Sequence, residues 1–135
     1  MTKQRFGEAR VILPVPTTPE AASAQHRAEA ALIEAFGGYT RSRGDGAWFD
    51  GSRTIHEIVY IYDVSVPYLS GTGEDAYREW AGAMTALRAI AKTAAREMQQ
   101  ECIYLRAPTG RVHLIRPDGR DYNPDVEPHP YPRAR

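Results

Sequence analysis

The sequence predicts an α+β fold in which two helices cover one face of an antiparallel sheet, the ferredoxin-like arrangement. The patterns run in the order strand, helix, strand, strand, helix, strand, which gives βαββαβ, and a further C-terminal strand follows. Both helical segments carry an alanine-rich apolar stripe. Between them, residues 55–66 are apolar on both faces at the centre, which is typical of a strand in the middle of a covered sheet.

The first strand is predicted at residues 11–15. Pro14 and Pro16 donate no backbone hydrogen bond, so we expect this short strand either to lie at an edge of the sheet or to end there. A helix follows, with Thr17 as its expected N-terminal cap. Gly37 ends this helix, because glycine adopts the left-handed conformation of a closing turn without a steric penalty.

The centre of the chain is predicted to contain two strands, one within residues 39–49 and one at residues 55–66. Residues 39–43 and 47–49 have a strand pattern, and residues 44–46, Gly-Asp-Gly, read as a turn or bulge between them. The longest strand, residues 55–66, is expected to supply the middle of the sheet. The loop that follows leads to a second helix.

The second helix is predicted over residues 74–100, with Thr72 as its cap. At 1.5 Å per residue it would be about 40 Å long, so we expect a break near Gly82. Two short strands, residues 101–105 and 112–115, then form a hairpin.

The 135 residues fit one domain of ordinary size. We expect a flexible N-terminus at residues 1–8, a single domain over residues 9–116, and a proline-rich, disordered tail at residues 117–135. The N-terminus lacks the apolar region of a secretory signal, and no apolar stretch is long enough to span a bilayer. These features predict a cytoplasmic protein without a membrane partner.

Charge and composition disfavour several functions. The chain has 17 basic and 17 acidic residues, whereas duplex DNA binding usually needs a basic excess. The four histidines are too dispersed to predict a metal site, and a single cysteine, Cys102, excludes an internal disulfide. Residues 70–73, Ser-Gly-Thr-Gly, precede a helix, but Glu74 and Asp75 place negative charge where a phosphate would bind. No cofactor is expected.

Candidate catalytic residues are His56 and Glu57, although neighbours in a strand point to opposite faces and do not act as a pair. Glu57, Asp63 and Glu101 lie on related strand faces, and two of them sharing a desolvated pocket would create a general acid. The candidate ligand- or partner-binding residues are Arg41, Trp48, Glu57, Tyr60, Tyr62 and Glu101. The competing interpretation places the aromatic residues in the core or in a dimer interface.

The element order is also that of an RNA recognition motif, in which Tyr60 and Tyr62 would stack on bases. The basic-glycine-aromatic signature of that motif is missing from residues 55–66, and the net charge is zero. Nucleic acid is therefore a disfavoured partner.

Several short motifs resemble a loose group of small uncharacterised bacterial and phage- or plasmid-borne proteins with a ferredoxin-like α+β pattern. The motifs are Phe36-Gly37-Gly38-x-Thr40, Gly46-x-Trp48, Glu57 opening an apolar strand, and Gln100-Glu101 before Ile103. The resemblance covers about residues 10–106 and implies the fold and dimerisation. Its recurrent positions here are Trp48, Glu57, Gln100 and Glu101. The last hairpin and the proline-rich tail depart from the pattern.

The leading hypothesis is a non-enzymatic binding or interaction module. It would be a homodimer through the open sheet face, an accessory protein of a mobile element that binds a host protein or a small nucleotide-like ligand. The alternative is a small cofactor-independent enzyme of the dimeric α+β barrel kind, in which Glu57 or His56 moves a proton while Tyr60 and Trp48 shape the pocket. An enzyme needs a concave pocket with a titratable group of shifted pKa, whereas a module needs only an exposed patch.

Overall fold

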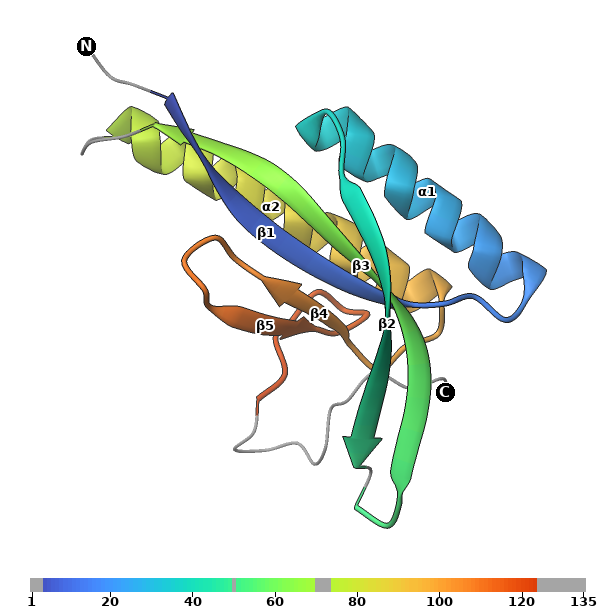
Figure 1. Ribbon diagram of the computed structural model, residues 1–135. Coiled ribbons are helices and arrows are strands. Elements are labelled where there is room, and N and C mark those ends of the chain that lie inside the picture. The colour runs from blue at the N-terminus through green and yellow to red at the C-terminus, as the bar shows by residue number, and fades with distance from the viewer. Residues whose placement is uncertain (1–3, 50, 70–73, 124–135) are drawn as a thin grey trace.

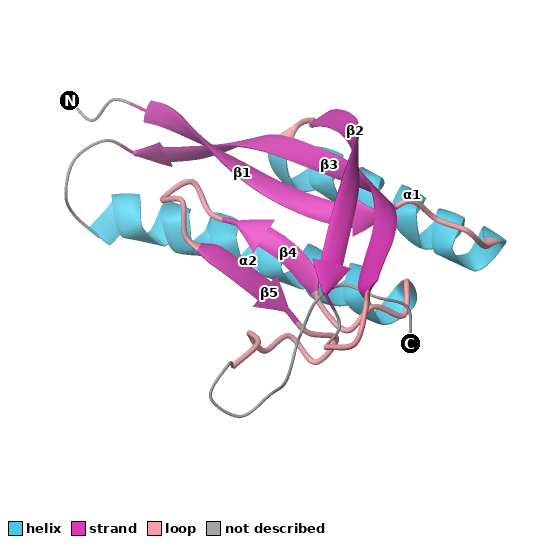
Figure 2. Ribbon diagram, turned by 60° about the horizontal axis from the view of Figure 1, so that its bottom comes forward, coloured by secondary structure: helices cyan, strands magenta, loops and turns pink. Residues whose placement is uncertain are grey.

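The computed structural model describes residues 4–49, 51–69 and 74–123, which form five strands and two helices (Figure 1). The elements are β1 (Gln4–Pro14), α1 (Pro19–Phe36), β2 (Thr40–Phe49), β3 (Thr54–Leu69), α2 (Glu74–Glu97), β4 (Ile103–Arg106) and β5 (Val112–Ile115). The strands form one antiparallel sheet in the order β2-β3-β1-β4-β5. Both helices lie on the same side of this sheet (Figure 2). The predicted α+β class is confirmed, with β5 extending the four-stranded pattern at one edge.

The core lies between the sheet and the helices. Strand residues of alternate positions point to the helices, because side chains in a strand alternate between its two faces. The buried residues that fill this layer include Ala9, Val11, Leu13, Leu32, Tyr62, Val64, Val66, Leu87, Ala91, Ile103, Leu105 and Ile115. Within β3, Tyr62, Val64 and Val66 are all at most 1% exposed. We call the opposite side of the sheet, which carries Glu57, Ile61 and Asp63, the open face.

β1 lies inside the sheet and has 11 residues, so the predicted edge position and short length are wrong, whereas the alternative, a strand that ends at the prolines, is confirmed by its end at Pro14. It pairs with β3 along its whole length and with β4 from Arg10 to Ile12. Pro14 is tolerated because it lies beyond the last pair with β4, and the next residue, Val15, donates its backbone N–H to the carbonyl of Ile58 at 3.0 Å. The strand begins at Gln4, inside the segment for which the sequence predicts flexibility.

β2 is one continuous strand, so the turn predicted at residues 44–46 is absent. Its ladder with β3 runs without interruption from Thr40 to Phe49. Gly44 and Gly46 both keep φ values outside the left-handed region, and the extended chain therefore passes through them.

The helix boundaries depend on local capping. Thr18, rather than the predicted Thr17, caps α1 by accepting a hydrogen bond from the N–H of Ala21 at 3.1 Å. Gly37, with a φ of 85°, ends α1 as predicted. α2 continues through Gly82 without the predicted break, because one glycine weakens a helix but does not end it. Gly82 is exposed, and a Cβ atom added there would meet no described atom within 4 Å.

The C-terminal part of the described chain folds back on β5. β4 begins at Ile103 rather than residue 101, Cys102 is fully buried beside it, and β5 has the predicted bounds. Tyr122 donates its N–H to the carbonyl of Leu114 at 2.9 Å. The predicted cap Thr72, the loop at residues 70–73 and the tail from residue 124 lie outside the described residues. In the part of the chain that is described, neither helix is long and apolar enough to cross a membrane.

Candidate functional site

A buried polar cluster joins α1 to β2 and β3 on the helix side of the sheet. Glu29 lies one turn after Gln25 on the buried face of α1 and is only 8% exposed. Its Oε2 accepts hydrogen bonds from the Tyr62 hydroxyl at 2.8 Å and from Arg41 Nη1 at 2.7 Å. Gln25 Nε2 adds a bond to the same oxygen at 3.2 Å and one to the Tyr62 oxygen at 3.1 Å. The guanidinium of Arg41 lies 4.5 Å from the centre of the Tyr60 ring.

The charge of Glu29 is well compensated in this cluster. Burial alone raises the pKa of Glu29, but the hydrogen bonds from Tyr62, Arg41 and Gln25 lower that pKa below its ordinary value of 4.5. Burial raises the pKa of Tyr62, which therefore stays a neutral donor. Three donors of the chain converge on Oε2, and Oε1 lies 3.5 Å from Nδ1 of His26, so the carboxylate of Glu29 holds α1, β2 and β3 together. We interpret this cluster as structural.

Glu57 has the opposite environment. It lies on the open face of β3, half-buried, directly across the ladder from Gly46 of β2. Its Oε1 is buried, and no described residue donates a hydrogen bond to it. Burial raises the pKa of Glu57, and no hydrogen bond or charge from the described part of the chain offsets this change. A desolvated carboxyl without a donor is costly for the fold, and such groups are typical of sites that receive a ligand or a proton.

The structure divides the predicted site residues between the two faces of the sheet. Arg41, Tyr60 and Tyr62 lie on the helix side, in or beside the Glu29 cluster. Trp48 shares the open face with Glu57, because it lies two residues after Gly46 on β2.

The remaining candidates lie apart from Glu57. His56 is exposed and points to the other side of the strand. Asp63 is six residues along β3 and forms an ion pair with Arg10, with an Nε to Oδ1 distance of 2.8 Å. Glu101 lies in the turn before β4.

Two residues of the Glu29 cluster were missed from the sequence. Gln25 and Glu29 are polar positions one turn apart, next to the apolar stripe of Ala24, Ala28 and Leu32. Polar residues at that spacing on the edge of a buried stripe are the signal that would have indicated a buried polar contact.

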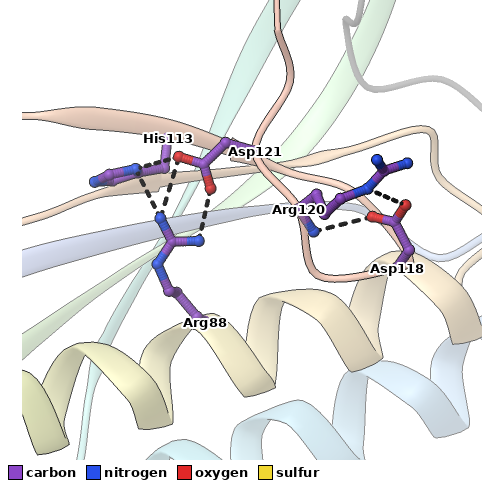
Figure 3. Close-up of polar contacts among 5 residues, drawn as sticks. All are labelled: Arg88, His113, Asp118, Arg120 and Asp121. Atoms are coloured by element: carbon purple, nitrogen blue, oxygen red, sulfur yellow. Dashed lines mark hydrogen bonds and ion pairs between the residues drawn. The ribbon is translucent and has the colours of Figure 1, made fainter.

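A second polar cluster, outside both sites, fastens the segment after β5 (Figure 3). Arg88 of α2 forms two bonds to the carboxylate of Asp121, at 2.6 and 3.1 Å. His113 of β5 places its Nδ1 2.8 Å from the same carboxylate. Within the turn between them, Asp118 accepts bonds from the backbone N–H and the Nε of Arg120. We call the contact of Arg88, His113 and Asp121 the C-terminal clasp.

A groove between the helices is a further hollow of note in the described chain. This groove of about 250 Å³ lies between α1 and α2, lined mostly by alanines and bordered by the ion pair of Arg27 with Glu97. It contains no catalytic arrangement. Among the residues that the structure describes, no group of three or more His, Cys, Asp or Glu side chains is placed to hold a metal ion.

Comparison with known proteins gives a likeness of fold. No protein-family model matches the chain, and no curated protein matches it. The structure is similar to that of a phage SAM lyase in complex with S-methyl-5′-thioadenosine, with a TM-score of 0.54 and 14% identity. The match covers 82% of this chain and 89% of the lyase. The phage origin of this neighbour agrees with part of the resemblance described from the sequence, whereas the loose group itself has no matching family model.

This comparison corrects the leading functional hypothesis. The sequence favoured a non-enzymatic interaction module, but the similar structure is that of an enzyme with a small molecule bound. The finding favours the alternative, a small enzyme, over the interaction module. The sequence indicates Glu57 as a candidate but does not show its distinctive property, because the burial of its Oε1 without a hydrogen-bond donor among the described residues exists only in the folded chain.

Proposed function

We propose that this protein is a small lyase that cleaves a carbon–sulfur bond in an adenosyl sulfonium compound of the SAM class, with Glu57 as the proton-accepting group. The observation that carries the proposal is the buried Glu57 oxygen without a donor among the described residues. The fold similarity to a SAM lyase supports the reaction class. Glu29 differs from Glu57, because its Oε2 already accepts hydrogen bonds from Arg41 and Tyr62. This contrast supports Glu57 as the reactive carboxyl.

The chemistry needs only a base. SAM, S-adenosylmethionine, carries a positively charged sulfur bonded to three carbons. Formation of S-methyl-5′-thioadenosine breaks the bond from sulfur to the amino-acid chain, and both electrons of that bond stay on sulfur, which becomes neutral. When a base removes a proton from the next carbon of the chain, the electrons of that C–H bond form a C=C bond. This elimination consumes no water, oxidant or cofactor.

Glu57 suits this task for two physical reasons. A carboxylate of raised pKa is a stronger base than an exposed one, so its proton transfer is more favourable once it is ionised. A cationic ligand next to a buried carboxyl favours the ionised form, because opposite charges attract strongly where water is excluded. Binding of the sulfonium would therefore favour the ionised form of Glu57, which is the form that the reaction needs.

The test is to incubate the purified protein with SAM and to identify both products by chromatography and mass spectrometry. We expect S-methyl-5′-thioadenosine together with an unsaturated amino acid. Glu57→Gln should lower kcat/KM by roughly 100- to 10,000-fold, the usual contribution of a general base. Glu34→Gln, which makes the same change at an exposed position of α1, is the matched control and should keep the parent rate.

Three results would contradict the proposal. The first is the absence of S-methyl-5′-thioadenosine with the parent protein. The second is a Glu57→Gln variant that retains its activity. The third is a cyclic ester as the second product, because the substrate's own carboxylate would then have displaced the sulfur and Glu57 would not be the base.

The homodimer through the open face is a separate part of the proposal. Ile12, Ile61, Tyr104 and Leu114 give this face half-buried apolar side chains across four strands. A second copy would bury them. Light scattering on a sizing column should give about twice the chain mass of 15.1 kDa, and Ile61→Glu should give the single mass. A parent protein of single mass would refute the dimer. A cytoplasmic location stays a prediction.

A further inference from the structure

Two glycines of β2 are placed where a side chain would be expected. Gly44 and Gly46 lie on the open face with Trp48, across the ladder from Val59 and Glu57 of β3. Neither glycine has a left-handed φ, so the backbone conformation does not require glycine at either position. Glycine inside a strand weakens it and often marks a place where another group approaches the backbone closely.

At Gly46 the approaching group is the indole ring of Trp48. A Cβ atom added at Gly46 would lie 3.2 Å from the Cζ2 and Nε1 atoms of Trp48 and 3.3 Å from its Cε2. The ring therefore lies back along β2, over the bare backbone of Gly46, and its Nε1 is buried. At Gly44 the corresponding space is taken by the side chain of Ile61, whose Cδ1 would be 3.2 Å from an added Cβ.

The ring over Gly46 is a neighbour of Glu57. Directly opposite residues of an antiparallel pair have Cβ atoms about 4.5–5.5 Å apart on the same face, and Glu57 is directly opposite Gly46. An indole above Gly46 therefore stands beside the Glu57 side chain. Its carbon atoms displace water from that side of the carboxyl and supply no hydrogen bond in return, in agreement with the buried, unpartnered Oε1 among the described residues.

We propose that Gly46 and Trp48 are positioning residues for Glu57: the missing side chain at Gly46 allows the indole to lie beside the carboxyl, keep water from it and fix its orientation. The inference rests on the proposed function for what Glu57 then does. It adds that the dehydration of Glu57 comes from one ring, and that the ring's place depends on the absence of a single methyl group.

The experiment uses Gly46→Ala in a Trp80→Phe background, so that Trp48 is the remaining tryptophan. Two readouts are independent of activity: the emission maximum of Trp48, and the pH titration of the Glu57 carboxyl followed by carbon-13 NMR. Gly46→Ala should displace the ring and shift its emission to longer wavelength. It should also move the midpoint of the Glu57 titration, called the Glu57 midpoint below, to lower pH. The acid limb of the kcat/KM profile should move in the same direction.

Gly44→Ala is the matched control. It adds the same methyl group to the same face of the same strand, but against Ile61 instead of the ring. It should leave the Trp48 emission and the Glu57 titration as in the parent. Trp48→Leu should lower the Glu57 midpoint by itself, and adding Gly46→Ala to it should change nothing more, because the ring is already gone.

The inference is overturned if Gly46→Ala leaves the Glu57 midpoint unchanged, or if Gly44→Ala moves it as far. A failure of the proposed function looks different: no variant, the parent included, would release S-methyl-5′-thioadenosine, while the titration would still respond to Gly46→Ala. Should Gly46→Ala not fold, the titration of Trp48→Leu decides by the same criterion.

Discussion

Replacing Tyr62 by phenylalanine tests whether the Glu29 cluster is structural. The Tyr62 side chain is fully buried, and its hydroxyl donates to Glu29 and accepts from Gln25. Phenylalanine keeps the edge-on ring contacts with Tyr39 and Tyr60, at centroid distances of 5.2 and 6.4 Å. Tyr62→Phe therefore removes the two hydrogen bonds and leaves the apolar packing in place.

The expected cost is worked from these contacts. A hydrogen bond to a charged group contributes about 1.5–3 kcal/mol, and Glu29 keeps its bond from Arg41 at 2.7 Å. We therefore expect a loss of about 2 kcal/mol. With an unfolding entropy of about 2.1 cal/mol/K per residue, the 135-residue chain gives about 0.28 kcal/mol/K, and Tm should fall by about 7 °C.

Thermal unfolding at pH 7, followed by circular dichroism and calorimetry, measures this loss. Tyr60→Phe is the matched control, because it keeps a ring under the Arg41 guanidinium and leaves the Glu29 contacts intact. A fall in Tm of less than about 2 °C, or an equal fall for Tyr60→Phe, would refute the reasoning. A Tyr62→Phe variant of parent stability that no longer cleaves SAM would place this cluster in the active site instead.

Two further predictions concern pH and the C-terminal clasp. The folded pKa of Glu29 is lowered, so Glu29 contributes stability above pH 4.5, and this stability is lost as pH falls through its folded pKa. The folded pKa of Glu57 is raised, so Glu57 costs stability as pH rises from about 4.5 through its folded pKa. Glu29→Gln should therefore lower Tm at pH 7, Glu57→Gln should raise it, and both differences should shrink toward acid pH; a Glu57→Gln variant less stable at pH 7 would contradict this. Arg88→Ala should cost only about 1 kcal/mol, since both partners are about one third exposed, and should speed hydrogen exchange at the Tyr122 amide; an unchanged exchange rate there would show that the clasp does not hold the segment.

The elements predicted well are those with local signals. Gly37 ends α1 as expected, because a left-handed residue after a helix favours glycine wherever the helix packs. The length of β1 was missed, because Glu8 and Arg10 interrupt its apolar residues, and the segment from Gln4 is a strand through its pairing with β3. The residues 44–46 were misread because glycine was taken as a turn signal, whereas Gly46 provides space for a ring.

The candidate site was predicted in part for the same reason. The sequence could indicate Glu57 and Trp48, which lie on one face of a predicted strand pair. It could not predict that Arg41 and Tyr62 turn to the other side, because that contact depends on where α1 docks and brings Glu29. Within the described chain, Glu29 is buried with hydrogen-bond donors and Glu57 without one, and this difference arises only when the helices and the sheet assemble.

The central place of β1 also affects how the chain reaches its fold during synthesis. Arg10 pairs with Asp63 on one side and with Arg106 on the other, so β1 is completed by β4, a strand that is synthesised much later. At about 5–20 residues per second, roughly 5–20 seconds pass between the synthesis of Arg10 and that of Arg106. Throughout that interval one edge of β1 is open to other chains, and the hairpin of β4 and β5 must arrive to close it.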